Sequence, residues 1–360
     1  MEKFFKPYLI SILLALGHGL NDLLAGYLLI YFYQNQSYEI ANSLFFAYII
    51  LGFGCQSFAG LLIDYFPQPK FLIILCCFLW FFAAFYKQMN VVILVFFIGI
   101  ASAFVHVVGG NITLSLAKQK AKHVGIFISP GALGLALGAY FAYLKIDLFL
   151  FVLLFSSFLM VAFAYLDFSK TSTLKVENQP FDGKSNKIAK FKKIEIWGII
   201  LGLMLVLSIR SFIWEIGQYV HQGNYNSIII IGSFAFIGKL MGGFLSDKIN
   251  HGLFLVVTLF ISFICLIFDF GNIWVEGIGF SFLQASLPLS ILQISALFEK
   301  RIGFSIGLAL GFAILLGGIP FLFTNYDINN LSLIVAVFSG LIIIILALLK
   351  PLLNQVEKDK

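Results

Sequence analysis

Long apolar runs, separated by short polar segments, account for most of the chain. Twelve runs can be drawn, at about residues 7–32, 41–63, 70–86, 91–116, 123–144, 147–166, 196–219, 227–246, 252–268, 273–297, 303–324 and 330–349. A helix needs about 20 apolar residues to cross the roughly 30 Å of hydrocarbon in a bilayer, so each run predicts a membrane-spanning helix. The connections are mostly short, which makes neighbouring helices antiparallel. The pattern therefore predicts an all-α membrane protein with twelve transmembrane helices.

One polar stretch is longer than the other connections and divides the runs into six and six. Residues 167–195 contain seven lysines, namely Lys170, Lys175, Lys184, Lys187, Lys190, Lys192 and Lys193. We expect an N-terminal six-helix bundle at 1–166, a cytoplasmic basic linker at 167–195, and a C-terminal six-helix bundle with a short cytoplasmic tail at 196–360.

The composition agrees with a membrane protein. The chain is 61% hydrophobic and 11% charged, with a mean hydropathy of +1.00, whereas soluble domains are about 25% charged. The first apolar run is too long for the core of a cleavable signal peptide, so we expect it to stay in the protein. The four cysteines lie inside apolar runs without metal-ligand spacing and are expected to be inert packing residues.

The basic residues give the orientation. If the N-terminus is cytoplasmic, 19 of the 23 Lys and Arg residues fall on the cytoplasmic side and two, Lys87 and Lys145, on the other. This bias follows the positive-inside rule in successive loops and predicts that both termini are cytoplasmic, in a bacterial-type inner membrane. The basic segments are therefore orientation signals, and no nucleic-acid partner is expected.

Three polar residues interrupt the first run. His18, Asn21 and Asp22 are spaced three and four apart and share one helix face. Lipid would reject that face, so it must look into a polar interior. A buried carboxylate that gains and loses a proton is suited to proton coupling, with His18 and Asn21 as hydrogen-bonding neighbours. The alternative is a structural polar cluster.

The two halves repeat one motif. Gly60-Leu61-Leu62-Ile63-Asp64 closes the second run, and Gly243-Phe244-Leu245-Ser246-Asp247 closes the eighth. Because each lies at the same place in its half, the chain reads as an internal duplication of two pseudo-symmetric bundles.

This repeated motif resembles that of the major facilitator superfamily of transporters. Within it the chain is most similar to the fosmidomycin-resistance type of efflux protein, through His18-Gly19-Leu20-Asn21-Asp22, Gly99–His106 and Lys300–Leu308. The resemblance implies two bundles rocking around a central cavity lined by the first and fourth helices. It thereby implies that His106 of the fourth run joins His18 and Asp22 in the proton-coupling group. It also implies a cytoplasmic gate that stabilises the outward-facing state through each motif aspartate, a neighbouring helix N-terminus and nearby basic residues. The gate residues are Gly60, Asp64, Lys70, Gly243, Asp247 and Lys248.

The second half carries charges inside its apolar runs. They are Arg210 and Glu215 on the seventh run, Lys239 on the eighth and Glu276 on the tenth. Unpaired buried charge is costly, so neutralising pairs between these acids and bases are expected. An unpaired Arg210 would instead bind an anionic substrate through its guanidinium.

The roles expected of the tryptophans and of Gln218 differ. Trp80, Trp197 and Trp274 are expected to be interfacial anchors or filling, whereas Trp214 could line the cavity beside Arg210, together with Gln218. No nucleotide-binding loop, catalytic constellation or metal-ligand set is found, so we expect no enzyme activity, cofactor or metal.

The sequence predicts a monomeric secondary transporter that exports a small organic solute in exchange for protons across the lipid bilayer. Two alternatives remain: proton-coupled uptake of an anionic metabolite recognised by Arg210 and Lys239, and a transporter-like membrane sensor or scaffold.

Overall fold

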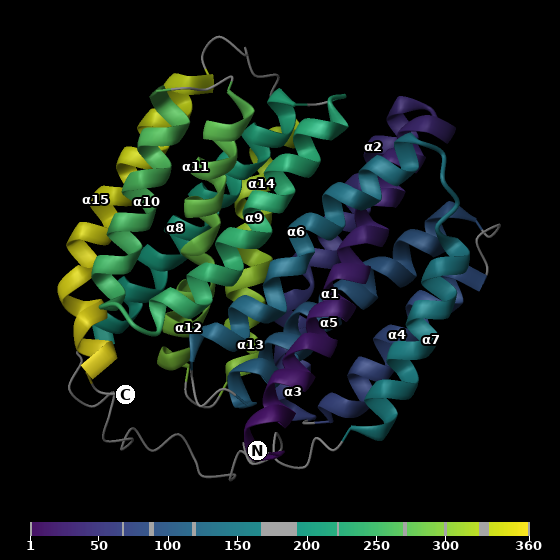
Figure 1. The fold of residues 1–360 in the computed structure, drawn as a ribbon, viewed down its shortest axis with the longest axis horizontal. Coiled ribbons are helices and arrows are strands. Elements are labelled where there is room, and N and C mark those ends of the chain that lie inside the picture. The colour runs from purple at the N-terminus through teal and green to yellow at the C-terminus, as the bar shows by residue number, and fades with distance from the viewer. Residues whose placement is uncertain are drawn as a thin grey trace.

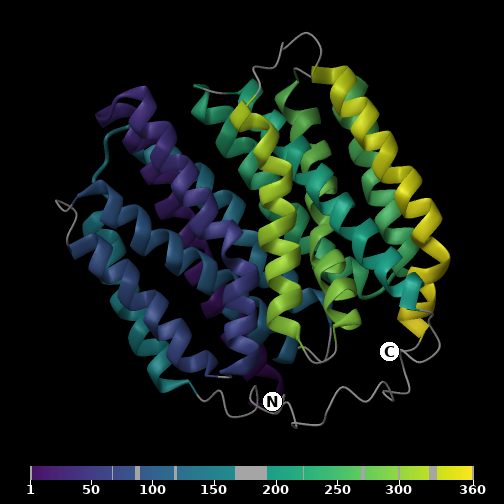
Figure 2. The ribbon, with the colours of Figure 1, turned by 180° about the vertical axis from the view of Figure 1, so that it is seen from behind.

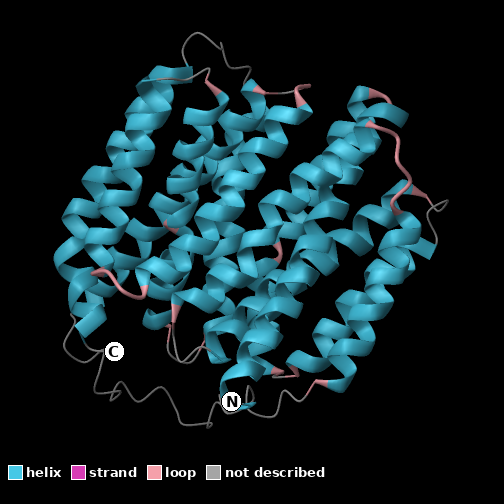
Figure 3. Cartoon of the chain, viewed as in Figure 1, coloured by secondary structure: helices cyan, strands magenta, loops and turns pink. Residues whose placement is uncertain are grey.

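The computed structural model describes residues 2–66, 68–85, 90–116, 120–166, 193–221, 223–268, 272–298, 301–323 and 331–358. All regular secondary structure in these ranges is helical (Figure 3). The expected linker at 167–195 falls mostly outside the described residues. Helix α8 begins at Lys193, so the last three positions of that linker already belong to the helix.

The helices follow the twelve predicted runs. Those before the linker are α1 (Glu2–Asn35), α2 (Tyr38–Ile49), the π-helical segment η1 (Ile50–Gly54), α3 (Gln56–Tyr65), α4 (Pro69–Phe85), α5 (Val91–Leu116), α6 (Ala121–Tyr143) and α7 (Phe149–Tyr165). Those after it are α8 (Lys193–Val220), α9 (Tyr225–Ser246), α10 (His251–Phe268), α11 (Ile273–Ala285), α12 (Leu287–Leu297), α13 (Ile302–Ile306), the π-helical segment η3 (Gly307–Phe312), α14 (Ala313–Phe323) and α15 (Leu331–Lys358).

Three of the predicted runs are divided along their length. The second consists of α2, η1 and α3, and the eleventh of α13, η3 and α14, each with a π-helical segment in the middle. The tenth is divided into α11 and α12 at Ser286, just before Pro288, which lacks a backbone donor. π-Helical segments and prolines are the usual origins of bends in long helices.

The helices form a multi-pass membrane protein. Within the described ranges, nine helical stretches are long and apolar enough to cross a membrane, and three shorter apolar helices, α4, α7 and α10, accompany them. Large apolar side chains also lie exposed on the outside of the molecule, for example Phe58, Leu150 and Leu348, at 72%, 68% and 74% exposure. Lipid is the solvent that suits such a surface.

Helices α1–α7 lie on one side of the molecule and α8–α15 on the other (Figures 1 and 2). The two sides meet mainly where α6 packs against α9, and where α3 packs against α13 and η3. The beginning of α1 and the end of α15 lie at the same end of the molecule, which we call the termini face (Figure 1).

Glycines bring α6 close to α1. A Cβ atom added to Gly134 or Gly138 would collide with the backbone carbonyls of Gly19 and Leu23, respectively. Larger residues would push the helices apart, so the glycine series of α6 serves close helix packing. This packing seats α6 against the polar face of α1.

Candidate functional site

The polar face of α1 meets α5 and α6 in the interior of the first half. His18 and His106 are 3% and 4% exposed, and Asn21 is fully buried, whereas the Asp22 side chain keeps 19% exposure. Gly131 of α6 makes room for them, because a Cβ there would collide with the Asp22 carboxylate and the His18 ring. The structure thus brings together the four residues that the sequence predicted to cluster.

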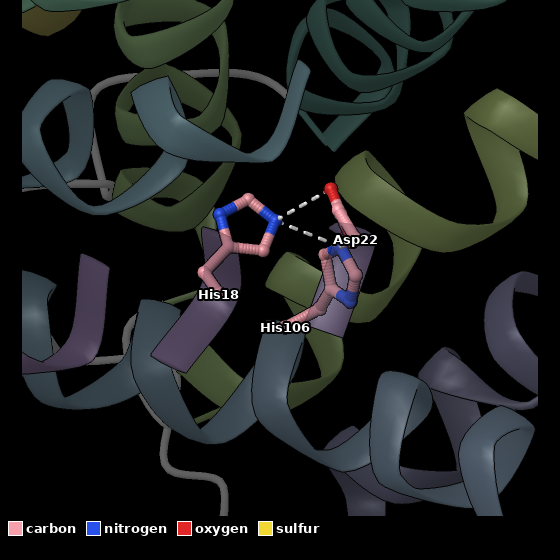
Figure 4. A group of neighbouring side chains, drawn as sticks. All are labelled: His18, Asp22 and His106. Atoms are coloured by element: carbon pink, nitrogen blue, oxygen red, sulfur yellow. Dashed lines mark hydrogen bonds and ion pairs between the residues drawn. The ribbon is translucent and has the colours of Figure 1, made fainter. Parts of the chain in front are cut away.

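His18, Asp22 and His106 form a compact group (Figure 4). Nε2 of His18 lies 3.0 Å from Nε2 of His106 and 3.3 Å from Oδ2 of Asp22. Nε2 of His106 lies 3.7 Å from Oδ1 of Asp22. One carboxylate therefore faces both imidazoles.

The other ring nitrogens fix the tautomers. Nδ1 of His18 lies 3.0 Å from the carbonyl oxygen of Phe127, and Nδ1 of His106 lies 2.7 Å from that of Ser102. A carbonyl oxygen only accepts, so both Nδ1 atoms must carry hydrogen. In two neutral imidazoles the facing Nε2 atoms would then both present lone pairs. A 3.0 Å contact is favourable when one proton lies between them, and the resulting positive charge is balanced by Asp22.

A second set of hydrogen bonds holds Asn21. Its Nδ2 donates to Oδ1 of Asp22 at 3.0 Å and to Oγ of Ser102 at 3.1 Å, while its Oδ1 accepts from Nε1 of Trp80 at 3.2 Å. Tyr48 also donates to Oγ of Ser102, at 3.3 Å. Sequence reasoning missed Ser102, Tyr48 and Trp80 as neighbours. Of the two roles expected for Trp80, an interfacial anchor or filling, its complete burial agrees with filling.

One group of side chains in the described part of the chain could hold a metal ion. It consists of His18, Asp22 and His106, whose possible ligand atoms lie within 4.8 Å of one another. The sequence predicted no metal. A proton needs only one donor and one acceptor about 3 Å apart, so the contact between the histidines is already complete for it. A tetrahedral zinc ion would require a fourth ligand.

Arg210 of α8 is the most buried cation of the second half that the structure describes. It is 3% exposed, and its Nη1 donates to Oε1 of Gln284 on α11 at 2.6 Å. Its Nε is buried and has no hydrogen-bond partner among the described residues. Lys239 of α9 lies within electrostatic range of both Arg210 and Asp22. No pattern in the sequence pointed to Gln284.

The neutralising pairs expected from the sequence are not formed within the described ranges. Oε2 of Glu276 lies 2.5 Å from Nε2 of His221. Arg210, Glu215 and Lys239 form no ion pair with any residue that the structure describes. Helix spacing cannot show which neighbouring helix supplies a counter-charge, so the pairing of these residues stays a prediction.

A cavity of about 300 Å³ lies between the two sides of the molecule. Its lining comes from α1, α6, α8, α9 and the connection before α9, and includes Gly26, Leu135, Trp214, Gln218, Tyr225 and Ile231. Gly26 is one helical turn beyond Asp22, and Trp214 is one turn beyond Arg210. Both helices run away from the termini face, so Asp22 and Arg210 lie nearer that face than these lining residues, and neither of them lines the cavity.

At the termini face, Asp64 joins the two sides. Its Oδ1 and Oδ2 accept hydrogen bonds from the backbone N–H groups of Gly303 and Phe304, at 2.8 and 2.9 Å. Gly60, one turn earlier, allows this approach, because a Cβ there would collide with the Gly303 carbonyl. A carboxylate on the exposed N–H groups of a helix N-terminus is favourable in both hydrogen bonding and electrostatics.

Asp247 makes the corresponding contact in the other direction. Its Oδ1 and Oδ2 accept from the N–H groups of Ala121 and Lys122 at the start of α6, at 2.8 and 3.2 Å. Gly243 again lies one turn earlier, where a Cβ would come 2.9 Å from the Ala121 carbonyl oxygen. The duplicated motif thus builds two similar contacts between the sides.

The basic residues of the predicted gate lie elsewhere. Lys70 donates to the carbonyl of Ala164 at 2.6 Å, within the first half. Lys248 is exposed, and the described part of the chain offers its side chain no hydrogen-bond partner. Arg301 takes the place expected of these lysines, since it lies in electrostatic range of Asp64.

The family model described as Major Facilitator Superfamily matches residues 8–270. The chain belongs to the Major Facilitator Superfamily. The superfamily fold extends over the chain: the E. coli fucose:proton symporter FucP in its outward conformation has a TM-score of 0.70 at 15% identity, covering 97% of this chain and 99% of that one. A single-site variant of FucP gives a TM-score of 0.69 at 16% identity over 97% and 99% of the two chains.

The human organic anion transporter MFSD10 (TETRAN) gives a TM-score of 0.71 at 14% identity, over 97% of this chain and 100% of that one. No curated protein matches the chain in sequence. Identities this low show the superfamily fold alone. In this Major Facilitator Superfamily transporter, the two aspartate contacts join the two sides at the termini face.

Proposed function

We propose that the protein is a secondary active transporter that moves a small organic solute by alternating access and couples this movement to protons. The observation that supports it best is the contact between His18 and His106, which has room for one proton beside the Asp22 carboxylate. Asp22 and the two histidines carry the coupling proton, and Asn21 orients the carboxylate. FucP, a fucose:proton symporter, shows that this fold can be coupled to protons.

The proposed architecture has twelve membrane spans in two pseudo-symmetric bundles, residues 1–166 and 196–360. The termini face is the cytoplasmic side of a bacterial-type inner membrane, as the basic residues predict. Asp64 and Asp247 then form the cytoplasmic gate, and the cavity opens outward. The functional unit is a monomer.

Export and uptake are the two possible directions of transport, and each is favoured by a different observation. The resemblance to fosmidomycin-resistance-type proteins favours export in exchange for protons. Proton-coupled uptake of an anionic metabolite is favoured by Arg210 and Lys239, neither of which is paired with a carboxylate among the described residues. Flux measured with the proton gradient imposed in each direction separates the two.

The experiment uses the full-length protein in liposomes that contain a pH-sensitive dye. Small organic solutes are added with and without a pH gradient, and proton movement that depends on solute identifies the substrate. Asp22→Asn should abolish solute-dependent proton movement, because an amide cannot carry the proton. Exchange of solute between the two sides, which needs no net proton transfer, should continue.

Unchanged proton-driven transport by Asp22→Asn would contradict the coupling role. Protein that moves no solute in any gradient would favour the remaining alternative, a transporter-like sensor or scaffold. Lys350→Gln, which removes an exposed charge far from the cavity on α15, is the control for loss of charge as such.

A further inference from the structure

The walls of the cavity between the two sides carry no charged side chain. Sixteen residues line it, and none of them is Asp, Glu, Lys, Arg or His. Arg210, Lys239 and Asp22 all lie outside this lining. Burying an ion without a counter-charge is very costly, whereas a neutral polar group that finds a hydrogen bond costs far less. The walls therefore favour an uncharged occupant over an anion or a cation.

Two side chains on one face of α8 bring hydrogen-bonding groups to the cavity. Trp214 and Gln218 are one helical turn apart, both line the cavity, and both are half-buried. Neither the indole N–H of Trp214 nor the amide of Gln218 makes a hydrogen bond with any residue that the structure describes. An indole N–H donates, and an amide both donates and accepts. The pair can therefore bind a group that has an acceptor and a donor of its own.

The indole ring of Trp214 is held by its neighbours. It meets the ring of Phe280 on α11 edge-on, with the centroids 5.6 Å apart and the planes at 89°. Phe280 is fully buried and lies against Gly217, where a Cβ would collide with its ring. A side chain that is already fixed loses little freedom when a ligand binds. Trp214 is thus a preorganised aromatic part of the cavity wall.

The remaining walls are mainly apolar and lie close together. Leu135 of α6 and Ile231 of α9 are part of them. A Cβ at Gly232 would come 2.8 Å from Cβ of Ala136, so α6 and α9 cross closely at this point. The volume of about 300 Å³ is at the small end of ligand pockets. A single ring with a short polar substituent suits a cavity of this size and lining.

On the basis of the transport function proposed above, we infer that the cavity binds an uncharged, compact organic molecule with an apolar ring and one neutral carbonyl group, such as a carboxamide. The carbonyl oxygen accepts from the indole N–H of Trp214. The Gln218 amide exchanges hydrogen bonds with the same group, and the ring packs against Leu135 and Ile231. The inference names the class of solute that the transporter moves.

An uncharged solute can be coupled to protons through α6. Ala132 lines the cavity, and Gly131, the residue before it, makes room for the Asp22 carboxylate and the His18 ring. Adjacent residues of one helix thus contact the solute and the proton group. A solute that shifts α6 changes the room available to Asp22 and His18, so coupling requires no charge on the solute.

Charged solutes would each meet a like charge near the cavity. Aromatic rings such as that of Trp214 can attract a cation. Arg210, however, lies one helical turn before Trp214, is buried, and forms no ion pair with any described residue. Asp22 lies one turn before Gly26 in the same way and would repel an anion. The three charge types are therefore compared directly in the experiment.

The experiment uses three planar molecules of nearly the same shape. Near neutral pH, benzamide is uncharged, benzoate is an anion and benzamidine is a cation. Binding to the full-length protein in detergent is measured by equilibrium dialysis against protein-free micelles, and the melting temperature is recorded in parallel. Trp214→Phe removes the N–H, Gln218→Leu removes the amide, and Gln218→Glu adds a carboxylate. The matched controls outside the cavity lining are Trp197→Phe on the same helix and Gln68→Glu in an exposed connection.

Benzamide should bind the wild type at least about tenfold more tightly than benzoate or benzamidine, because neither ion finds a counter-charge in the walls. Trp214→Phe and Gln218→Leu should each weaken benzamide binding about two- to tenfold, the loss expected for one neutral hydrogen bond. Gln218→Glu should reverse the preference, so that benzamidine binds more tightly than benzamide, because the new carboxylate supplies the counter-charge. Both control variants should bind all three molecules as the wild type does.

Benzoate or benzamidine binding as tightly as benzamide, or no binding of any of the three, would overturn the inference. Benzamide binding unchanged in both Trp214→Phe and Gln218→Leu would overturn the assignment of these residues. A misfolded variant would show a lower melting temperature before any probe is added, and the binding gained in Gln218→Glu cannot result from misfolding. Proton-coupled transport of charged solutes alone would refute this inference and leave the proposed transport function standing, whereas benzamide binding without transport of any solute would refute the function instead.

Discussion

The Nε2 atoms of His18 and His106 lie 3.0 Å apart while both Nδ1 atoms are held by backbone carbonyls. Neither ring can turn its Nε2 away without losing a buried hydrogen bond. A proton between the rings removes the repulsion of two lone pairs, and Asp22 balances its charge. The two rings are thus placed to share one proton, which is the property that the following prediction tests.

His106→Gln should reduce proton-driven transport strongly and should leave solute exchange without a gradient largely intact. Glutamine can still donate a hydrogen bond but cannot carry the positive charge. The measurement is flux in proteoliposomes across a range of pH values, in which the variant should show a flatter pH dependence. His251→Gln, at the first residue of α10, is the matched control, and a pH profile equal to that of the wild type in His106→Gln would refute the shared proton.

Gly131→Ala should impair both stability and coupling. The added methyl group would collide with the Asp22 carboxylate and the His18 ring, and overpacking of this kind costs about 1–3 kcal/mol. Melting temperature and proton-driven flux should both fall. Gly318→Ala is the control, since a Cβ there meets no atom within 4 Å and alanine raises helix propensity by up to about 1 kcal/mol.

Asp64→Ala and Asp247→Ala should each open the termini face more often. Loss of a carboxylate that accepts two N–H groups costs about 1 kcal/mol, which shifts a two-state equilibrium about fivefold. Spin labels at Phe66 and Ile249, in a variant without the four native cysteines, should report longer distances. We expect Asp147→Ala to have no effect on them, because Asp147 caps α7 within one half.

The double variant Asp64→Ala/Asp247→Ala should show the two shifts combined if the contacts act on the same closing movement. Distances unchanged in all three variants would show that the aspartates do not hold this face closed.

Glu215→Gln and Glu276→Gln should differ in their effect on stability. Glu215 is half-buried and has no ion-pair partner among the described residues, so neutralising it should leave the melting temperature unchanged or raise it. Glu276 is fully buried against His221, and its loss of charge weakens a bond of about 1.5–3 kcal/mol, so the melting temperature should fall. Equal effects of the two substitutions would contradict this assignment.

Much of the architecture can be predicted from the order of residues. Apolar runs specify helices locally, because in lipid a helix is the segment that satisfies its own backbone hydrogen bonds. The repeated pairs of Gly60 with Asp64 and Gly243 with Asp247 can also be recognised in the sequence, because the two residues of each pair are one helical turn apart. The cluster of His18, Asn21 and Asp22 needed only the periodicity of one helix.

The partners of the second-half charges were decided by tertiary structure. Arg210 meets Gln284, and Glu276 meets His221, on helices whose facing sides no local pattern reveals. Trp80 reaches Asn21 and Asp64 reaches Gly303 for the same reason, since each contact depends on how separate helices rotate and cross. The sequence by itself determined which segments are helical and which faces are polar. Only the packing of those helices decided which polar groups are satisfied and which, like Nε of Arg210, have no hydrogen-bond partner among the described residues.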